Sequence, residues 1–311
     1  MSYRPKSCWK VGLDGKTLIN KDGEKMNIYI SGGNGMLGSS LGAKLSKENF
    51  VIKSFSHTDL DVTNNDLVKK VLEESPDVFI HTAAWTNVDA CEIDKNKATQ
   101  ININGTENLV NALGSNTMFI YISSTGIYGN YKNTPYTEND NVKPTTIYHK
   151  TKYEGELVVK EKTKNHLILR TGWLYGGDAT HKKNFVYKRY LEGTSNNKIY
   201  GDKSQSGCPT YVDNLANQIS FLLDKKITGT FNCVDTGFVT RFEYVKEILD
   251  CFNLKTELKA APQNMYDRIA KISHNEGAIN QSLNDLNLNI MKNWKESLHR
   301  YIENLKKVYN Y

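Results

Sequence analysis

The chain has 311 residues and a net charge of +6, with Lys and Arg spread along its whole length. That spread argues against a nucleic-acid-binding protein, in which basic runs are interleaved with aromatic residues. The mild positive excess favours a small anionic ligand. A composition rich in Lys and Asn would give the same excess without functional meaning. No segment reaches the roughly 18 apolar residues that a membrane helix needs, and residues 1–10 lack the apolar core of an export signal. We therefore expect a cytoplasmic protein that contacts neither membrane nor nucleic acid.

The cysteines are odd in number and widely scattered. No two of them have the spacing of metal ligands, so we expect reduced thiols and no metal site. The five positions are Cys8, Cys91, Cys208, Cys233 and Cys251.

Residues 1–25 are set apart as an N-terminal extension, because a strand and a glycine-rich loop start directly after Met26. The turn dipeptides Asp14-Gly15 and Asp22-Gly23 flank a short apolar stretch. A small hairpin fits this pattern, and a disordered tail fits it equally well.

From residue 26 onward the pattern alternates between strands and helices, which predicts a doubly wound parallel sheet. The strands are expected at 28–30, 51–55, 77–80, 118–122 and 167–169. The helices between and after them are expected at 36–45, 67–74, 98–113 and 148–162. Beyond about residue 175 the order is less regular, with helices near 184–192, 213–224, 241–252 and 293–307. We assign 26–175 to a nucleotide-binding domain and 176–311 mainly to a smaller substrate-binding lobe, interleaved with the first.

A glycine-rich segment, Ser31-Gly32-Gly33-Asn34-Gly35-Met36-Leu37-Gly38, joins the first strand to the first helix. Glycine allows a tight turn and lets backbone N–H groups approach phosphate oxygens at the positive end of the helix. In this context the segment predicts a dinucleotide site, although plain glycine-rich turns are common.

No carboxylate stands directly at the end of the second strand, where an acid would bind an adenosine ribose. Ser56, His57 and Thr58 occupy that position, and Asp59 and Asp61 come slightly later. Hydroxyl and imidazole groups tolerate a 2′-phosphate, which favours NADP(H) over NAD(H). Asp61 is expected nearer the adenine.

Three side chains form a candidate acid–base set. Tyr148 and Lys152 are four residues apart and share one face of the predicted helix. An ammonium beside a phenol lowers its pKa and makes it a better proton shuttle. Ser124, at the end of the fourth strand, would donate to a substrate carbonyl. Each feature is weak alone, but their order along the chain is specific.

The chain resembles the extended short-chain dehydrogenases/reductases, and within them the dTDP-4-dehydrorhamnose reductase family, from about residue 26 to the C-terminus. The similarity rests on five segments. They are TAAWTNVDACE at 82–92, YHKTKYEGE at 148–156, RTGWLYG at 170–176, DKSQSGCPTY at 202–211 and WKESL at 294–298.

The resemblance implies a Rossmann-type fold and specific roles for residues. Tyr148, Lys152 and Ser124 would be catalytic. Tyr148 and Lys152 would also contact the cofactor, together with Gly32, Gly35, Met36, Leu37, Asp61, Val62, Ala83 and Ala84. Thr86, Val88, Ser124, Trp173 and Asn184 would approach the sugar. Trp173 could equally be a core residue.

Two segments depart from the family. Where the family has S-T-D-Y, this chain has Ser124-Thr125-Gly126 preceded by Ser123, so an acid and an aromatic ring are missing. The missing ring at Gly126 predicts extra room at the sugar. The family's Arg-Pro is absent around 273–278. The run at 124–129 is closer to the sugar-nucleotide epimerases.

The expected activity is NAD(P)H-dependent reduction of the C4 keto group of a nucleotide-linked 4-keto-6-deoxy sugar, in deoxysugar and surface polysaccharide biosynthesis. A sugar-nucleotide epimerase or epimerase-reductase remains an alternative. So does a non-catalytic NADP-binding regulatory subunit, as in the β subunit of methionine adenosyltransferase. A homodimer is compatible with all three.

Overall fold

The computed structural model describes residues 9–11, 18–20, 22–48, 50–262, 265–266 and 268–309. Near the N-terminus, β1 (Trp9–Val11) pairs antiparallel with β2 (Leu18–Asn20). The pairing agrees with the hairpin alternative, and the Asp14-Gly15 turn lies outside the described residues.

A parallel six-stranded sheet forms the centre of the molecule, in the order β12-β7-β6-β5-β3-β4. Its strands are β3 (Asn27–Ser31), β4 (Val51–Phe55), β5 (Val78–His81), β6 (Met118–Ser124), β7 (His166–Thr171) and β12 (Gly229–Asn232). The central strands β5 and β6 are buried almost throughout, as expected for a parallel sheet covered on both faces. The predicted doubly wound α/β fold is confirmed, and β12 joins the sheet from beyond residue 175.

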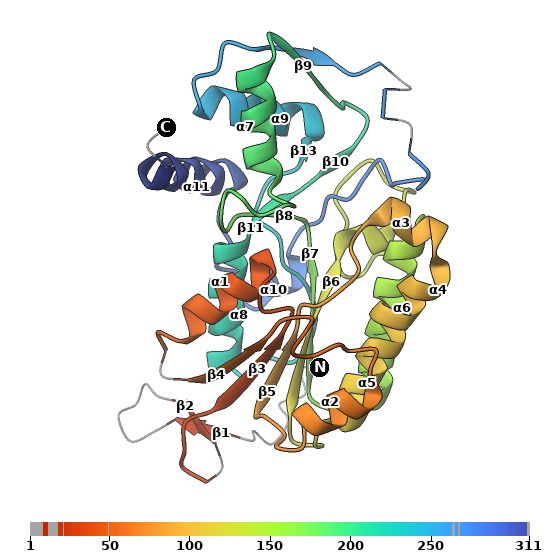
Figure 1. Ribbon diagram of the computed structural model, residues 1–311, viewed down its shortest axis with the longest axis vertical. Coiled ribbons are helices and arrows are strands. Elements are labelled where there is room, and N and C mark those ends of the chain that lie inside the picture. The colour runs from red at the N-terminus through yellow and green to blue at the C-terminus, as the bar shows by residue number, and fades with distance from the viewer. Residues whose placement is uncertain are drawn as a thin grey trace.

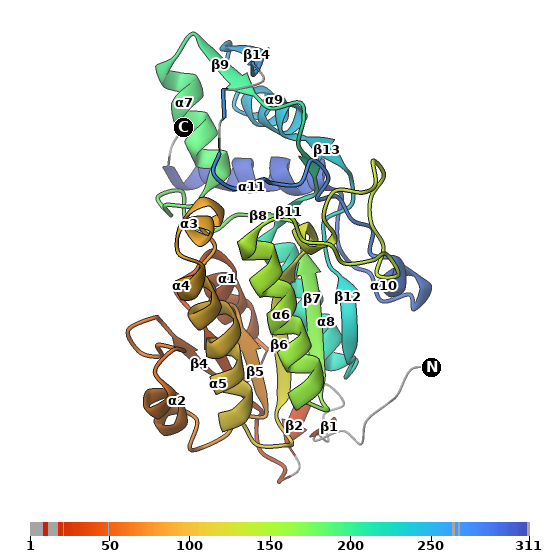
Figure 2. The same cartoon turned by 90° about the vertical axis from the view of Figure 1, so that its right-hand side faces the viewer.

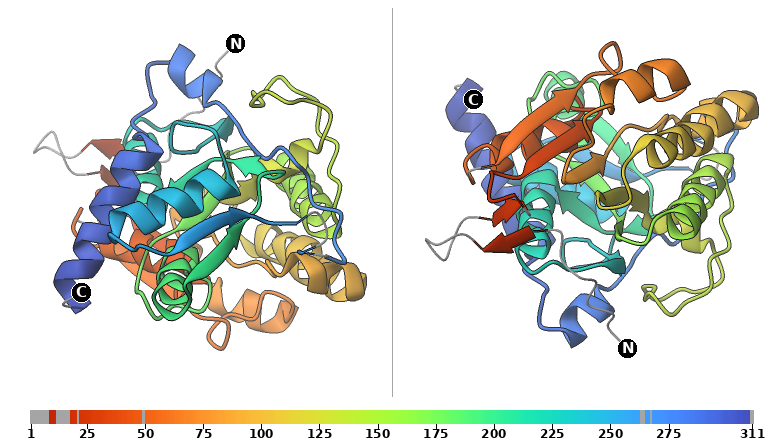
Figure 3. Two further views of the ribbon diagram at one scale, coloured as in Figure 1. Left: turned by 90° about the horizontal axis from the view of Figure 1, so that it is seen from above. Right: turned by 90° about the horizontal axis from the view of Figure 1, so that it is seen from below.

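Helices cover both faces of the sheet (Figures 1 and 3). One face packs on α1 (Met36–Leu45) and α8 (Val212–Asp224), through apolar residues such as Leu41 and Ile219. The other face packs on α2 (Asn65–Val71), α5 (Gly105–Ala112) and α6 (Ile147–Lys162), and Figure 2 shows α5 and α6 in front of the sheet.

The helix expected at 98–113 is divided in the structure. After α3 (Val88–Ile93), α4 (Lys95–Thr99) passes into a π-helical turn (Gln100–Asn104) and then into α5. Periodicity alone did not reveal this turn, which carries Asn102 and its side-chain contacts, described below.

A second lobe lies above the sheet in Figure 1. It contains α7 (Phe185–Ser195), α9 (Arg241–Cys251) and α11 (Trp294–Tyr309), with β9 (Lys198–Gly201) paired parallel to β14 (Glu257–Ala260). Two small pairs join the lobe to the sheet region: β8 (Trp173–Tyr175) with β11 (Pro209–Tyr211), and β10 (Ser206–Gly207) with β13 (Val239–Thr240). The short helix α10 (Gln281–Asp285) and a 3₁₀ turn (Thr125–Tyr128) complete the described elements.

The strand order reverses beside β3, because β4 pairs on one side of it and β5 on the other. At such a switch point the loops after neighbouring strands diverge and open a crevice at the carboxyl ends. The second lobe lies over this end of the sheet. Within the part of the chain that the structure describes, no helix is long and apolar enough to cross a membrane.

Candidate active site

A cleft of about 770 Å³ opens at the carboxyl ends of β3, β5 and β6, where the strand order reverses. Its walls come from the glycine-rich loop, the loops after β4 and β5, the start of α6 and the second lobe. One cleft therefore brings together segments from residue 32 to residue 276.

The glycine-rich loop leaves no room for a side chain at Gly32 or Gly38. Gly32 has φ +70°, and a Cβ there would lie 2.9 Å from the backbone nitrogen of Ala83. A Cβ on Gly38 would lie 2.3 Å from the Gly32 carbonyl oxygen. Helix α1 starts after Gly35 without a side-chain cap, and Gly32, Gly35, Met36 and Leu37 all line the cleft. Such a cradle of backbone N–H groups fits a diphosphate.

The loop after β4 brings two of the three residues predicted beside the adenosine ribose to the cleft. Ser56 and His57 line the cleft, as do Asp61 and Val62 farther along. The Asp59 carboxylate is outside the lining and accepts hydrogen bonds from the backbone nitrogen of Ser56 (2.9 Å) and from its Oγ (2.6 Å). These bonds hold the pKa of Asp59 below its usual value.

The loop after β5, which contains Ala83 and Ala84, is fixed by the side chain of Asn102 in the π-helical turn. Asn102 accepts from the Trp85 backbone nitrogen (2.8 Å), and it donates to the Trp85 carbonyl (3.2 Å) and to Thr151 Oγ1 (3.0 Å). Ala83 and Ala84 line the cleft. π-helical turns occur frequently at functional sites, and this one joins the loop to α6.

Tyr148 and Lys152 both line the cleft from the first turns of α6. The Lys152 side chain is 3 % exposed, and its Nζ lies 4.1 Å from the centre of the Tyr121 ring. Burial lowers the pKa of Lys152 to about 7, and burial, with Cys91 and Glu276 nearby, raises the pKa of Tyr148. The expectation that the lysine lowers the tyrosine pKa is not met in this structure, because burial and the nearby Cys91 and Glu276 all act to raise the pKa of Tyr148. Tyr148 is held as a neutral phenol.

Ser124 ends β6 at the cleft, and its Oγ accepts from the Gly126 backbone nitrogen (3.2 Å). A hydroxyl that accepts in this way keeps its own proton for donation.

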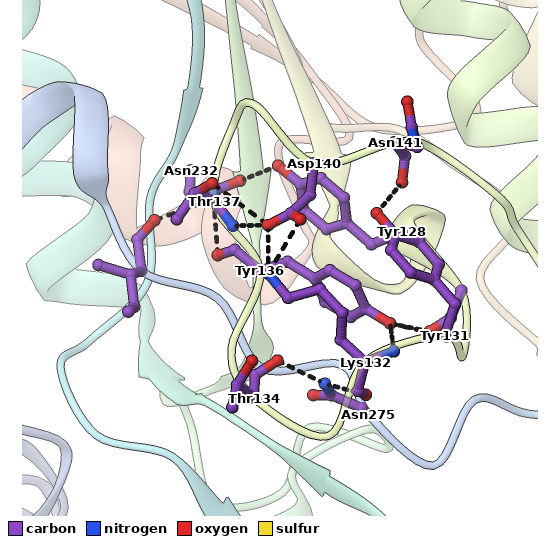
Figure 4. A network of polar contacts seen from close by, with 12 residues as sticks. Tyr128, Tyr131, Lys132, Thr134, Tyr136, Thr137, Asp140, Asn141, Asn232 and Asn275 are labelled. Atoms are coloured by element: carbon purple, nitrogen blue, oxygen red, sulfur yellow. Dashed lines mark hydrogen bonds and ion pairs between the residues drawn. The ribbon is translucent and has the colours of Figure 1, made fainter.

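The chain between Ser124 and α6 is held by a partly buried polar network around Tyr136 (Figure 4). The Tyr136 hydroxyl accepts from the backbone nitrogens of Tyr131 (3.1 Å) and Lys132 (3.2 Å). Asn275 donates to the carbonyls of Lys132 and Thr134, at 2.8 Å each. The network thereby fixes the long connection that carries the chain from the serine to the tyrosine.

The space expected to be open beside Gly126 is occupied. A Cβ at Gly126 would lie 2.2 Å from Nε2 of His149, so the imidazole of His149 fills the place of the missing ring. The prediction of extra room is wrong. His149, the residue after Tyr148 on α6, supplies this ring and lines the cleft.

Trp173 is both a core residue and a wall of the cleft, with 9 % of its surface exposed. Its Nε1 donates to Oε2 of Glu276 at 2.7 Å. The guanidinium of Arg241, at the start of α9, stacks 3.3 Å from the centre of the indole ring. Arg241 Nε also donates to Gln205 Oε1 (3.3 Å), and all four residues line the cleft.

Two bridges connect the second lobe to the rim of the cleft. Lys183 Nζ donates to Thr86 Oγ1 at 2.5 Å, and Arg268 forms an ion pair with Asp89 at 2.9 Å. Thr86 and Val88 line the cleft as predicted, and so do the two basic residues.

Asn184 does not line the cleft. Its side chain is fully buried, donates to Tyr301 Oη (2.5 Å) and to the Asp178 carbonyl (3.0 Å), and accepts from the Tyr187 nitrogen as the cap of α7. The expectation that it approaches the sugar is wrong for this structure, because its polar atoms are committed to the fold.

Sequence reasoning missed several cleft residues of the second lobe and assigned no role to His149. Arg241, Glu276, Lys183 and Arg268 belong to no recognisable motif, and only their convergence in space marks them. For His149 a signal was present, because a residue directly after the candidate catalytic tyrosine lies at the start of the same helix and can reach the same cleft.

Comparison with known proteins places the chain in a family. The model for the RmlD substrate binding domain matches residues 26–307. A dTDP-4-dehydrorhamnose reductase of Aggregatibacter actinomycetemcomitans is 33 % identical over 65 % of this chain and 69 % of its own. The solved dTDP-4-dehydrorhamnose reductase of Clostridium acetobutylicum superposes with a TM-score of 0.86 at 33 % identity, covering 90 % of this chain and 100 % of its own.

A second solved relative, the Bacillus anthracis dTDP-4-dehydrorhamnose reductase in complex with NADP, has a TM-score of 0.86 at 31 % identity, over 90 % of this chain and 99 % of its own. The glycine cradle, the Ser/Tyr/Lys set and the covering lobe occur here in the same fold. The chain belongs to the dTDP-4-dehydrorhamnose reductase family of extended short-chain dehydrogenases/reductases.

Proposed function

We propose that the protein reduces the C4 keto group of a nucleotide-linked 4-keto-6-deoxy sugar with NADPH, as a dTDP-4-dehydrorhamnose reductase does. The observation that carries this proposal is the single cleft in which a phosphate cradle and Ser124, Tyr148 and Lys152 face a polar, basic lobe. The position of this cleft at the switch point of the sheet is where α/β proteins bind dinucleotides.

Three side chains of the protein have separate roles in the proposed reaction. Bound NADPH would supply the hydride. Tyr148, kept neutral by burial, donates its phenolic proton to the oxygen that becomes a hydroxyl, and Ser124 Oγ–H orients the same oxygen. Lys152 helps to return a proton to Tyr148 after the transfer, because its pKa of about 7 lets it gain or lose a proton near neutrality.

NADPH is the preferred cofactor in this proposal. Ser56 and His57 line the cleft, while Asp59, the acid nearest to them in the sequence, is outside the lining and accepts a hydrogen bond from Ser56. A 2′-phosphate would meet hydroxyl and imidazole donors there instead of a carboxylate. Asp61 is the acid within the lining, and the proposal assigns it to the adenine. Gly32, Gly35, Met36 and Leu37 would hold the diphosphate, Asp61 and Val62 the adenine, and Ala83 and Ala84 the ribose side.

The substrate end carries several positive charges. Arg241, Arg268 and Lys183 line it together with Trp173, which offers a flat apolar face. Cations in a partly closed cleft attract the diphosphate of a sugar nucleotide. Thr86, Val88 and Trp173 would contact the sugar.

The test is to incubate the protein with NADPH and dTDP-, UDP-, GDP- and CDP-linked 4-keto-6-deoxy sugars, and to follow absorbance of the reduced nicotinamide. Oxidation with the dTDP sugar is expected. Interconversion of sugar epimers without oxidation would identify an epimerase. No reaction with any sugar, together with tight NADP(H) binding and a stable protein partner, would identify a regulatory subunit.

A further inference from the structure

The imidazole of His149 occupies a position in the cleft that only glycine at residue 126 allows. A Cβ on Gly126 would stand 2.2 Å from Nε2 and 2.3 Å from Cε1 of the ring. The rings of His149 and Tyr148 lie 5.0 Å apart. A polar ring thus lies beside the proton donor of the proposed reaction.

The contacts of His149 indicate which of its nitrogens carries the proton. Nδ1 lies 3.0 Å from Thr146 Oγ1, which already accepts from the His149 backbone nitrogen (3.2 Å). The threonine can therefore use its own hydroxyl proton for Nδ1. Nε2 lies 3.9 Å from Oε1 of Glu276, and a carboxylate at that side favours a proton on Nε2.

Glu276, which faces Nε2 of His149, is held in place by three hydrogen bonds. Its Oε2 accepts from Trp173 Nε1 (2.7 Å), its carbonyl accepts from Thr125 Oγ1 (2.7 Å), and its backbone nitrogen donates to the Ser206 carbonyl (2.8 Å). Among the described residues, Oε1 has no hydrogen-bond partner. The 3.9 Å from Nε2 to Oε1 is too long for a direct hydrogen bond.

A donor and an acceptor therefore face one gap beside Tyr148. An oxygen that lies to one side of this pair, at about 2.8 Å from each atom, can accept from Nε2–H and donate to Oε1, which only a hydroxyl or a water does. A keto oxygen has no proton for Glu276, and a methylene group would leave both buried groups without a partner.

We propose that His149 and Glu276 form a hydroxyl-recognition pair that determines which sugar the protein accepts. The inference rests on the proposed function. In a 4-keto-6-deoxy sugar, the neighbours of the reacting C4 are C3, which bears a hydroxyl, and C5, which bears the methyl group. The pair next to Tyr148 therefore binds the C3 hydroxyl, and the protein discriminates against 3-deoxy sugars.

The first experiment is His149→Phe, which keeps a ring beside Gly126 and removes the donor. Two dTDP-4-keto-6-deoxy sugars are compared, one with the C3 hydroxyl and one 3-deoxy. Wild type should prefer the first by roughly 10² or more in kcat/KM, and His149→Phe should lose most of that preference, since sites built to bind a hydroxyl discriminate strongly. The Kd for NADPH should be unchanged.

His166→Phe is a matched control. His166 also pairs through Nδ1 with a threonine three residues earlier, Thr163 (3.3 Å), but it is the first residue of β7, after α6 has ended, and it is outside the cleft lining. His166→Phe should keep the wild-type preference. This result would show that the effect of His149→Phe comes from loss of the donor in the cleft and not from loss of a Thr–His pair as such.

Gly126→Ala tests the placement of the ring, because the new methyl group must displace the imidazole. It should reduce the preference as His149→Phe does. In the double variant Gly126→Ala/His149→Gly the clash is absent, so the double variant should behave like His149→Gly alone.

Several outcomes would overturn the inference. An unchanged preference in His149→Phe, or no preference in wild type, removes the pair from recognition while leaving the reductase activity in place. Calorimetric binding of dTDP-rhamnose is measured in parallel. A wild type that neither oxidises NADPH nor binds any sugar nucleotide removes the proposed function as well, so the two failures are distinguishable.

Discussion

The two halves of the cleft are built in different ways. The half proposed for the cofactor is centred on the glycine-rich loop, in which a Cβ at Gly32 or Gly38 would clash with backbone atoms, and the loops after β4 and β5 complete it. The sugar half is made of side chains such as His149, Trp173, Arg241 and Glu276, which come from four distant segments. A contiguous backbone motif can serve any dinucleotide, whereas an assembly of side chains can be altered one residue at a time to suit a particular sugar.

Both halves meet at Tyr148, so its loss should have the largest effect. Tyr148→Phe keeps the ring and removes the proton donor, and kcat should fall by roughly 10² or more. Fluorescence titration should show NADPH binding close to that of wild type, because the glycine cradle is untouched. Near-normal turnover would remove Tyr148 from the mechanism.

The cofactor half should be intolerant of a single methyl group. In Gly38→Ala the new Cβ would stand 2.3 Å from the Gly32 carbonyl oxygen, so the loop must shift. Overpacking costs about 1–3 kcal/mol. Where this cost falls on the loop conformation that binds the diphosphate, the Kd for NADPH should rise by about 5- to 150-fold.

Gly42→Ala, on the same helix, is the control, because its Cβ would have Ser54 Oγ as the nearest atom at 3.4 Å. It should bind NADPH normally. Equal losses in the two variants would show that the defect is a general one of α1.

Cofactor selection should depend on the end of β4. Wild type should bind NADPH at least as well as NADH, and His57→Asp should weaken NADPH about 10-fold relative to NADH, by placing a carboxylate near the 2′-phosphate. Thr58→Asp adds the same charge one residue later, outside the cleft lining, and should change the ratio little. A wild type that prefers NADH would show that Asp59 or Asp61 reaches the ribose.

The last prediction is a pH dependence of stability in the cofactor-free protein. The pKa of Lys152 falls from 10.5 to about 7 on burial, so between these values the unfolded chain binds more protons than the folded one. Folding stability should therefore rise with pH from 7 towards 10, by at most about 1.4 kcal/mol per pH unit. Urea unfolding at pH 7, 8 and 9 should show this rise in wild type and a flatter profile in Lys152→Met. Parallel profiles would contradict the lowered pKa.

Local patterns predicted the elements that depend on neighbouring residues. The helix at 36–45 was placed correctly, and the strand at 51–55 matches β4. The spacing of glycines after Ser31 and of Tyr148 and Lys152 on one helix identified residues that line the cleft, because loop geometry and helical periodicity act over a few residues. The π-helical turn at Gln100–Asn104 escaped prediction, since Asn102 is held there by Trp85 and Thr151.

The sequence by itself determined the parallel α/β fold, the glycine-rich loop between the first strand and the first helix, and the placement of Tyr148 and Lys152 on one helix, because periodicity, glycine geometry and helical spacing are local properties. Only the tertiary structure decided the sugar half. It brought Glu276 to Trp173 across 103 positions of sequence, filled the space at Gly126 with His149, and committed Asn184 to capping α7. These outcomes depend on which side chains share a space and which are removed from water, and no local pattern contains that information.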